Sequence, residues 1–264
     1  MKKVLDFSDV TEARKAIKLE FPGIVSNLSA FPAEIGSWIK KGLFNSVRYD
    51  DCVIYIKEGE CTNNLFFIAP DFKTASIRIK EAIAEDSIDK TPVVAEIVDR
   101  SETESLEFPV MMTLNRMTRT GDTNFRPEKT DGIRDIRENE SSIVRELLKS
   151  NFNPVCESIP DEEEIKSLAM GGTAKVFIHD GEIKGLMLCS KDKSTIHLRY
   201  WWVSPDCRNS GVGSKLLNEF FRLGEGTPRQ ILWVDIDNIN AINKYEHFGF
   251  KKESIFDHIH IIKI

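Results

Sequence analysis

The strongest constraint on the fold is an apolar strand pattern that leads directly into a glycine-containing turn and an amphipathic helix. Residues 195–203 are rich in aromatic and β-branched side chains, and residues 211–223 have helical periodicity. A hairpin at 175–190, with an Asp-Gly turn at Asp180, precedes this unit. The pattern ends with a strand at 231–236, a helix at 239–247 and two strands at 250–256 and 258–264. This order predicts a mixed sheet with helices packed against it.

The remaining periodicity predicts α/β structure on both sides of a polar connector. Residues Thr118 to Gly132 concentrate turn-forming and charged side chains, so we expect an N-terminal α/β lobe over 1–120 and a second domain over 121–264. The second domain begins with helices at 133–150 and 161–170. In the first lobe, helices are expected at 9–20, 33–41 and from the candidate N-cap Asp71 to 85, with strands at 52–57, 64–69, 93–98 and 109–117.

The composition indicates a cytoplasmic globular protein. The chain has 264 residues, 41% apolar and 30% charged, with a net charge of -6, so an overall positive field for nucleic acid is not expected. Apolar runs are too short to span a bilayer, and Met1 to Asp6 lacks the apolar core of a signal peptide. The five cysteines are odd in number and form no C-x-x-C pair, which favours reduced thiols.

The turn between strand and helix, at residues 203–217, carries the clearest chemical signal. Backbone N–H groups at a helix N-terminus, together with the helix dipole, suit a pyrophosphate, and Gly211 and Gly213 leave room for its approach. Leu216 stands where a dinucleotide fingerprint needs its third glycine, and the Gly213-Ser214-Lys215 order differs from a Walker A loop. The alternative is an ordinary strand-to-helix turn.

A second segment, one strand further along the chain, strengthens the phosphate interpretation. Val203, Pro205, Arg208, Gly211 and Gly213 fit the pattern Arg/Gln-x-x-Gly-x-Gly/Ala after a strand that ends near Val-x-Pro. The pattern Asn-x-x-Ala-x-x-x-Tyr-x-x-x-Gly-Phe is matched at every position, by Asn238, Ala241, Tyr245, Gly249 and Phe250. In order and spacing, the two segments together resemble the GNAT acyltransferase superfamily, over about residues 133–264.

The resemblance implies direct transfer of an acyl group from acetyl-CoA, or another acyl-CoA, to an amine of a small molecule or peptide. It implies a GNAT-like fold in the C-terminal half, with no metal. Tyr245 would protonate the departing thiolate, because a neutral phenol can donate to developing negative charge. The implied donor-binding residues are Trp202, Val203, Arg208, Asn209, Ser210, Gly211, Val212, Gly213, Ser214 and Asn238. Packing of the Tyr245 ring, or an N-cap role for Asn238, is the structural alternative.

The strand before the loop departs from the family pattern, because no carboxylate stands where many members carry a glutamate base. His197 lies in that region and titrates near neutrality, so it is a candidate base. Asp235 is another, and water alone is a third. Tyr200, Trp201 and Trp202 predict aromatic surface beside the acyl group, although alternation prevents all three from facing one side.

Two further groups have weaker signals. His258 and His260 share a face of the last strand and have the spacing of metal ligands, but the sequence supplies no third ligand, so a plain edge strand is favoured. Cys207 adjoins the phosphate loop, where positive potential would lower the pKa of its thiol.

From Cys52 to Val98 the first lobe has the element order strand, turn, strand, helix, strand, which is similar to the middle of the same fold. Residues 69–73 stand in place of the glycine turn. We expect a degenerate GNAT-like lobe without a phosphate cradle, or an unrelated α/β cap. Two function classes remain open for the whole chain: an N-acyltransferase, and an acyl-CoA-binding sensor or interaction module that has lost catalysis. Aminoacyl-tRNA as the donor is disfavoured by the acidic composition and the intact loop. The sequence leaves the oligomeric state open.

Overall fold

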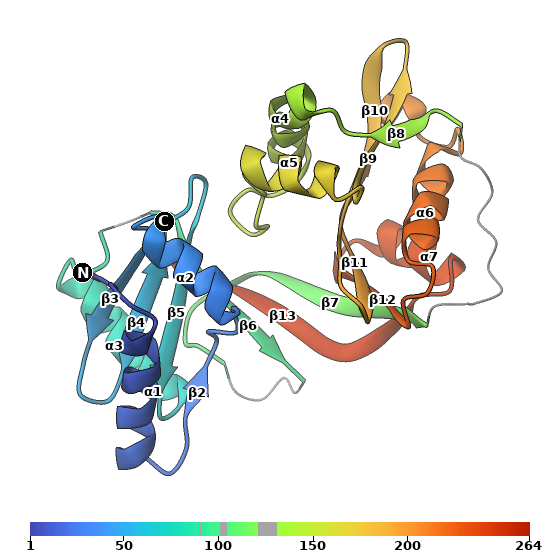
Figure 1. The fold of residues 1–264 in the computed structure, drawn as a ribbon. Coiled ribbons are helices and arrows are strands. Elements are labelled where there is room, and N and C mark those ends of the chain that lie inside the picture. The colour runs from blue at the N-terminus through green and yellow to red at the C-terminus, as the bar shows by residue number, and fades with distance from the viewer. Residues whose placement is uncertain (90, 101–104, 121–130) are drawn as a thin grey trace. The chain divides into compact units, whose positions relative to one another are not determined.

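The computed structural model describes residues 1–89, 91–100, 105–120 and 131–264, and these residues form two compact units (Figure 1). The first unit comprises Met1–Thr113, Pro154–Ser158 and Ile255–Ile264, and the second comprises Leu114–Asn153 and Ile159–Ser254. Both contain helices and strands, so the α/β class with mixed pairing is confirmed. Most of the connector expected over 118–132 lies in residues 121–130, outside the described part of the chain.

The first unit pairs its strands in the order β1-β3-β4-β5-β6-β13, with β2 attached to β5. Among the described residues of this unit, only the β5–β6 neighbours are parallel, at Asn63–Val93 and Asn64–Val94. The helices expected around 9–20, 33–41 and 71–85 are all present. The elements are β1 (Lys2–Lys3), α1 (Ser8–Glu20), β2 (Val25–Ser26), α2 (Pro32–Lys40), β3 (Phe44–Arg48), β4 (Val53–Lys57), β5 (Asn63–Ala69), α3 (Phe72–Ala84) and β6 (Val93–Asp99).

The second unit pairs its strands in the order β7-β12-β11-β10-β9-β8. The Asp-Gly turn joins β9 to β10 as expected, with positive φ at Asp180 (50°) and Gly181 (79°). The elements are β8 (Ile133–Asp135), η1 (Glu138–Glu140), α4 (Ser141–Asn151), α5 (Glu162–Met170), β9 (Ala174–His179), β10 (Glu182–Lys191), β11 (Thr195–Val203), η2 (Pro205–Cys207), α6 (Val212–Leu223), β12 (Arg229–Asp235) and α7 (Ile239–His247).

Two long strands contribute residues to both units. Strand β7 (Val110–Thr120) comes from the N-terminal half of the chain, and its residues 114–120 pair with β12 of the second unit. Strand β13 (Lys251–Lys263) ends the chain, and its residues 256–263 pair with β6 of the first unit. Each unit therefore has a strand position that is filled by the other half of the sequence.

Helices cover both faces of the sheet in the second unit. Helix α6 buries Val212, Leu216, Leu217 and Phe220, at the three- and four-residue spacing of an amphipathic helix, and packs in one cluster with residues of α7. Helices α4 and α5 pack in a separate cluster. Strand β11 contributes to both clusters, so it lies between the two helical layers.

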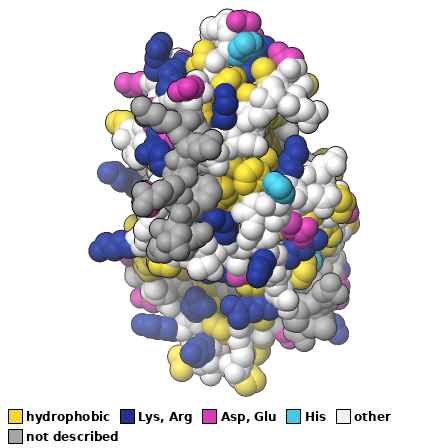
Figure 2. All heavy atoms as spheres, turned by 90° about the vertical axis from the view of Figure 1, so that its right-hand side faces the viewer, with side chains coloured by type: hydrophobic (Ala, Val, Ile, Leu, Met, Phe, Trp, Pro, Cys, Tyr) yellow, Lys and Arg dark blue, Asp and Glu magenta, His cyan; other side chains and the backbone are white. Residues whose placement is uncertain are grey.

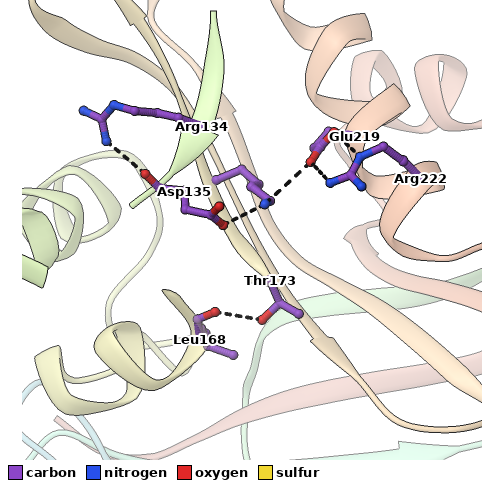
Figure 3. A network of polar contacts seen from close by, with 7 residues as sticks. Arg134, Asp135, Leu168, Thr173, Glu219 and Arg222 are labelled. Carbon is purple, nitrogen blue, oxygen red and sulfur yellow. Dashed lines mark hydrogen bonds and ion pairs between the residues drawn. The ribbon is translucent and has the colours of Figure 1, made fainter. Parts of the chain in front are cut away.

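Buried charges connect β8, β9 and α6 (Figure 3). The Lys175 ammonium lies 2.6 Å from an Asp135 carboxylate oxygen and 3.6 Å from Glu219, and Arg222 binds Glu219 with two hydrogen bonds. The Lys175 and Glu219 side chains are only 7% and 8% exposed. Removal of either charge would leave its partner buried without full compensation, so this network holds α6 against the start of the sheet.

Two expected elements differ in the structure. The helix expected over 133–150 begins at Ser141, because residues 133–135 pair with β9 as β8. The two strands expected at 250–256 and 258–264 are one strand, β13, in which Asp257 lies in register with Val98 instead of in a turn. In both places non-local strand pairing overrides the local pattern.

Candidate active site

The N-terminus of α6 presents backbone donors that no side chain caps. Gly211 occupies the N-cap position in the left-handed region (φ 85°), and the first bond that closes the helix runs from Lys215 N–H to the Gly211 carbonyl at 3.0 Å. The preceding amides of the first turn have no partner within the helix. A helix terminus of this kind favours a phosphate, because its N–H groups and its dipole both attract negative charge.

The loop before α6 is held by its own contacts. The Ser210 hydroxyl donates to the Cys207 carbonyl at 2.6 Å, and the Arg208 side chain donates to the Val203 carbonyl at 3.5 Å. Asp206 accepts from the Ser204 hydroxyl and lies 2.9 Å from the Lys184 ammonium on β10. These contacts hold the pKa of Asp206 at about 2, the Ser204 bond being the larger cause. The shape of the loop is thus supported by contacts within the chain itself.

Strand β11 contains a bulge at Arg199. Leu188 and Cys189 are consecutive on β10, yet they oppose Tyr200 and Leu198, so Arg199 is an extra residue. Its guanidinium pairs with Glu164 on α5. The parallel pairing of β11 with β12 stops at the same place, with Leu198 opposite Leu232. Residues 200–203 therefore have no register partner on β12 among the described residues, and the two strands separate toward the α6 terminus.

The bulge also decides which side chains face α6. Ile196 and Leu198, before the bulge, pack in the α6 cluster, and so do Trp201 and Val203 after it. Tyr200 and Trp202 pack with the α4–α5 cluster instead. An ideal Cβ on Gly213 would lie 2.9 Å from Cζ2 of Trp201, so a glycine is required here by the indole. The motif alone attributes the glycine to close approach of the phosphate.

Tyr245 lies on the same side of the sheet. Its ring is 5.4 Å from Trp201 and 5.9 Å from Phe250, and the residue is 8% exposed. The Asn238 side chain accepts from the Ala241 amide at 3.1 Å and caps α7, which carries Tyr245. The structure therefore brings Trp201, Val203, Tyr245 and the 208–214 loop together around α6 and α7.

His197 lies elsewhere. Its strand neighbours Ile196 and Leu198 face α6, so alternation directs His197 to the opposite face from Tyr245. Burial, with a smaller effect from Arg199, lowers the pKa of His197 to about 4. Asp235 accepts from the Asp237 amide in a turn after β12. Val234 packs in the α6 cluster, so alternation directs Asp235 to the other face as well. Neither candidate base lies on the face that carries Tyr245.

The cysteine beside the loop behaves differently from the expectation. Burial raises the pKa of the Cys207 thiol, and the Asp206 carboxylate raises it further. The expected lowering by positive potential is therefore wrong. His258 and His260 bond to hydroxyls of Thr113 and Ser105, and the structure shows no cluster of three or more metal-ligating side chains in the residues that it describes.

In the first unit, α3 and the β5–β6 pair stand where α6 and the β11–β12 pair stand in the second. Residues of the chain itself fill both places there. Asp71 caps α3 and accepts from the Thr74 amide at 2.6 Å, so a carboxylate already occupies the anion position. Strands β5 and β6 also separate, but β2 pairs with β5 there. Next to β2, the Asn27 side chain donates to the carbonyls of Leu65 and Glu96 and accepts from the Phe67 amide. Strand β2 and Asn27 thus occupy the space where β5 and β6 separate.

Comparison with known proteins agrees with this geometry. Residues 142–250 match the Acetyltransferase (GNAT) family, so this part of the chain is a GNAT acetyltransferase domain. An uncharacterized N-acetyltransferase from Methanocaldococcus jannaschii is 34% identical over 56 residues, which cover 20% of this chain and 25% of the relative. The match thus spans about a quarter of that relative's length.

Solved structures extend the similarity over both units. A GCN5-related N-acetyltransferase from Sphaerobacter thermophilus superposes with a TM-score of 0.55 and 15% identity, over 89% of this chain and 87% of that chain. A tandem GNAT protein from the clavulanic acid biosynthesis pathway gives a TM-score of 0.51 and 12% identity, over 96% and 88%. At these identities the comparison shows the fold alone.

The surface and the helices add two observations. On the face drawn in Figure 2, Lys and Arg side chains are spread among hydrophobic side chains that reach the surface. Within the described ranges, each helix is too short or too polar to cross a bilayer.

Proposed function

We propose that this chain is an N-acyltransferase that moves an acyl group, specifically an acetyl group, from CoA to a primary amine of a small molecule or peptide.

 Acetyl-CoA is the proposed donor, because the acetyl group is the usual cargo of the family that residues 142–250 match. The observation that carries the proposal is the uncapped α6 terminus beside the point where β11 and β12 separate. A phosphate would meet the α6 amides, and the unpaired edge of residues 200–203 would accept the extended arm behind it.

The proposed reaction is direct transfer. The amine nitrogen attacks the thioester carbonyl carbon, a C–N bond forms, and the C–S bond breaks. The Tyr245 hydroxyl gives its proton to the departing thiolate, which gains negative charge as it leaves. Support for this role is the position of Tyr245 against Trp201, on the α6 side of β11.

The attacking amine must also lose a proton. His197 remains the side-chain candidate, and it is neutral at pH 7, because its pKa is about 4. A group with so low a pKa is a weak base at neutral pH. Loss of the amine proton to water is therefore the simpler route, and Tyr245 can regain its own proton from solvent.

An acyl-CoA-binding sensor is the second candidate function. The observation that favours it is the lack of a carboxylate along β11, where residues 195–203 are Thr-Ile-His-Leu-Arg-Tyr-Trp-Trp-Val. Turnover separates the two functions. Acetyl-CoA is incubated with a panel of primary amines and the released thiol is measured. Thiol release that depends on an amine supports the enzyme, whereas CoA binding without release by any amine supports the sensor.

The phosphate cradle is tested by Gly211→Val. No heavy atom lies within 4 Å of a Cβ at this position, so the substitution acts through the backbone, which has a φ of 85° that valine disfavours. We expect CoA affinity to fall by tenfold or more, about 1.4 kcal/mol. Calorimetry on the wild type and the variant measures the change.

The matched control is Gly172→Val, since Gly172 also has positive φ (69°) and open space at its Cβ position, but it follows α5. This variant should carry similar backbone strain and keep its CoA affinity. Equal CoA binding by a folded Gly211→Val variant and the wild type would contradict the assignment.

A further inference from the structure

The indole nitrogen of Trp201 is a buried donor without an acceptor. Among the described residues, Trp201 Nε1 has no hydrogen-bond partner and almost no exposure to solvent. Buried polar groups are nearly always hydrogen-bonded, because an unmet donor has lost its contact with water and gained nothing in return. An orphan of this kind calls for a specific explanation.

The orientation of the ring places this donor beside the first turn of α6. Cζ2 of Trp201 lies 2.9 Å, and Cε2 lies 3.7 Å, from the Cβ position of Gly213. Nε1 is covalently bonded to Cε2, so the N–H belongs to the edge of the ring that contacts the helix. The Tyr245 ring lies 5.4 Å from the indole, and the Lys244 ammonium is 5.9 Å from its centroid.

Three groups near this edge are suited to an anion. The first-turn amides of α6 lack a cap, the indole N–H lacks an acceptor, and Lys244 adds positive charge. Donors do not satisfy one another, so an acceptor from outside the chain would suit this arrangement. An anionic oxygen at the α6 amides would lie close to the ring edge that carries Nε1.

We propose that Trp201 Nε1–H donates a hydrogen bond to a phosphate oxygen of the acyl-CoA donor and thereby helps to position the donor on α6. This inference rests on the proposed function. It assigns to a side chain part of the phosphate recognition that backbone amides otherwise supply, and it explains why a tryptophan and a glycine contact each other at the start of α6.

The next residue supplies a matched control. Trp202 Nε1 is also buried without a partner, but Trp202 packs with the α4–α5 cluster on the other side of β11. Its indole should therefore not contact a phosphate on α6. The donor-binding role that the resemblance implies for Trp202 would lie in its backbone, on the edge of residues 200–203, and Trp202→Phe keeps that backbone. The two tryptophans thus share residue type, strand and orphan N–H group, and differ in the face that they occupy.

The direct test follows the indole protons by NMR of the ¹⁵N-labelled full chain. The chain has four tryptophans, so Trp→Phe changes at Trp38, Trp202 and Trp233 identify the Trp201 signal by elimination. At saturating CoA, the Trp201 proton should move downfield and exchange more slowly, while the Trp202 proton moves little. A wild type that binds CoA with the Trp201 proton unmoved would overturn the inference and leave the proposed function intact.

Affinity gives an independent test. Trp201→Phe should weaken CoA binding about tenfold or more, and Trp202→Phe should change it little. ADP, which has the diphosphate, should show the same loss in Trp201→Phe, whereas pantetheine, which has no phosphate, should not. An equal loss for pantetheine would assign the N–H to the arm and overturn the phosphate contact. A wild type that binds no CoA would overturn both proposals.

Discussion

At the scale of single residues, two separate causes favour glycine at position 213: the expected phosphate and the Trp201 indole. The sequence places Gly213 in a phosphate-binding pattern, and the natural interpretation is that a Cβ would block the ligand. The structure shows that the Cβ would first meet the Trp201 indole, at 2.9 Å. The need for glycine is thus already present without a ligand.

The contact between these two residues predicts a coupled pair of substitutions. Gly213→Ala should destabilise the protein by about 1–3 kcal/mol, because the methyl group overpacks against a ring that tertiary contacts hold in place. In Trp201→Phe the smaller ring leaves space, so the same Gly213→Ala change should cost less there. Urea unfolding of the two single variants and the double variant measures the coupling. Additive effects would contradict a steric origin.

Tyr245 carries the residue-scale prediction for chemistry. Tyr245→Phe keeps the ring that packs against Trp201 and Phe250 and removes only the proton donor. If Tyr245 is the general acid, kcat should fall about 10²-fold or more with little change in CoA affinity. Steady-state kinetics and calorimetry check the two parts. Tyr55→Phe, the same change at a buried tyrosine of the first unit, should leave kcat unaltered. A Tyr245→Phe enzyme of normal kcat would exclude the role.

At the scale of elements, β6 and β13 place two carboxylates, half-buried Glu96 and buried Asp257, on one face of the first unit. Glu96 and Asp257 lie two residues out of register on these neighbouring antiparallel strands, and Asp257 is 8% exposed with one carboxylate oxygen unpartnered among the described residues. Burial, together with the Glu96 charge, raises the pKa of Asp257 to about 7. Burial also raises the pKa of Glu96, against smaller opposing effects of Ser158 and Lys57.

The pair predicts a stability that falls with rising pH. The folded pKa of Asp257 lies above the ordinary value of 3.8, so the folded state holds a proton that the unfolded chain releases. This contribution is complete below about pH 4 and is lost as pH rises through 7. Asp257→Asn removes the charge and should raise the free energy of unfolding at pH 8, by about 4 kcal/mol, with a smaller gain at pH 5.

Urea unfolding of the wild type and the variant at both pH values checks this expectation. The control is Asp89→Asn, a change at an exposed position of the same unit, which should give no pH-dependent difference. A gain from Asp257→Asn that is the same at pH 5 and pH 8 would show that charge is not its cause.

At the scale of the whole molecule, the exchange of β7 and β13 means that a single cut cannot separate the two units. Strand β12 has β7 on one side, and on the other side it is paired with β11 only as far as Leu232. Without β7, residues 233–235 would have no strand partner on either side among the described residues. Unpaired strand edges of this kind promote aggregation.

Two fragments test this dependence. A fragment of residues 123–264 lacks β7 and should be unfolded or aggregated, whereas a fragment of residues 110–264 retains it and should be the more soluble and structured of the two. Circular dichroism and size-exclusion chromatography compare them. A monomeric, cooperatively folded 123–264 fragment would show that β7 is dispensable for the second unit.

Features that depend on neighbouring residues can be predicted from the sequence. Helical periodicity predicts α1, α3 and α6, and the Asp-Gly pair predicts the β9–β10 turn. The spacing of Arg208, Gly211 and Tyr245 is typical of the GNAT domain that residues 142–250 match. These signals are local, because side-chain period, turn conformation and helix capping are set within a few residues.

Strand pairing, and the residues at which paired strands separate, depend on the tertiary structure. The bulge at Arg199 reverses the alternation of β11, so Trp201 faces α6 and His197 faces away, a reversal that a regular two-residue period could not predict. The exchange of β7 and β13 and the closure of the first unit by β2 likewise involve partners far apart in the chain. The physical reason is that strand register and partner choice depend on hydrogen bonds to distant segments, whose identity no local window of sequence contains.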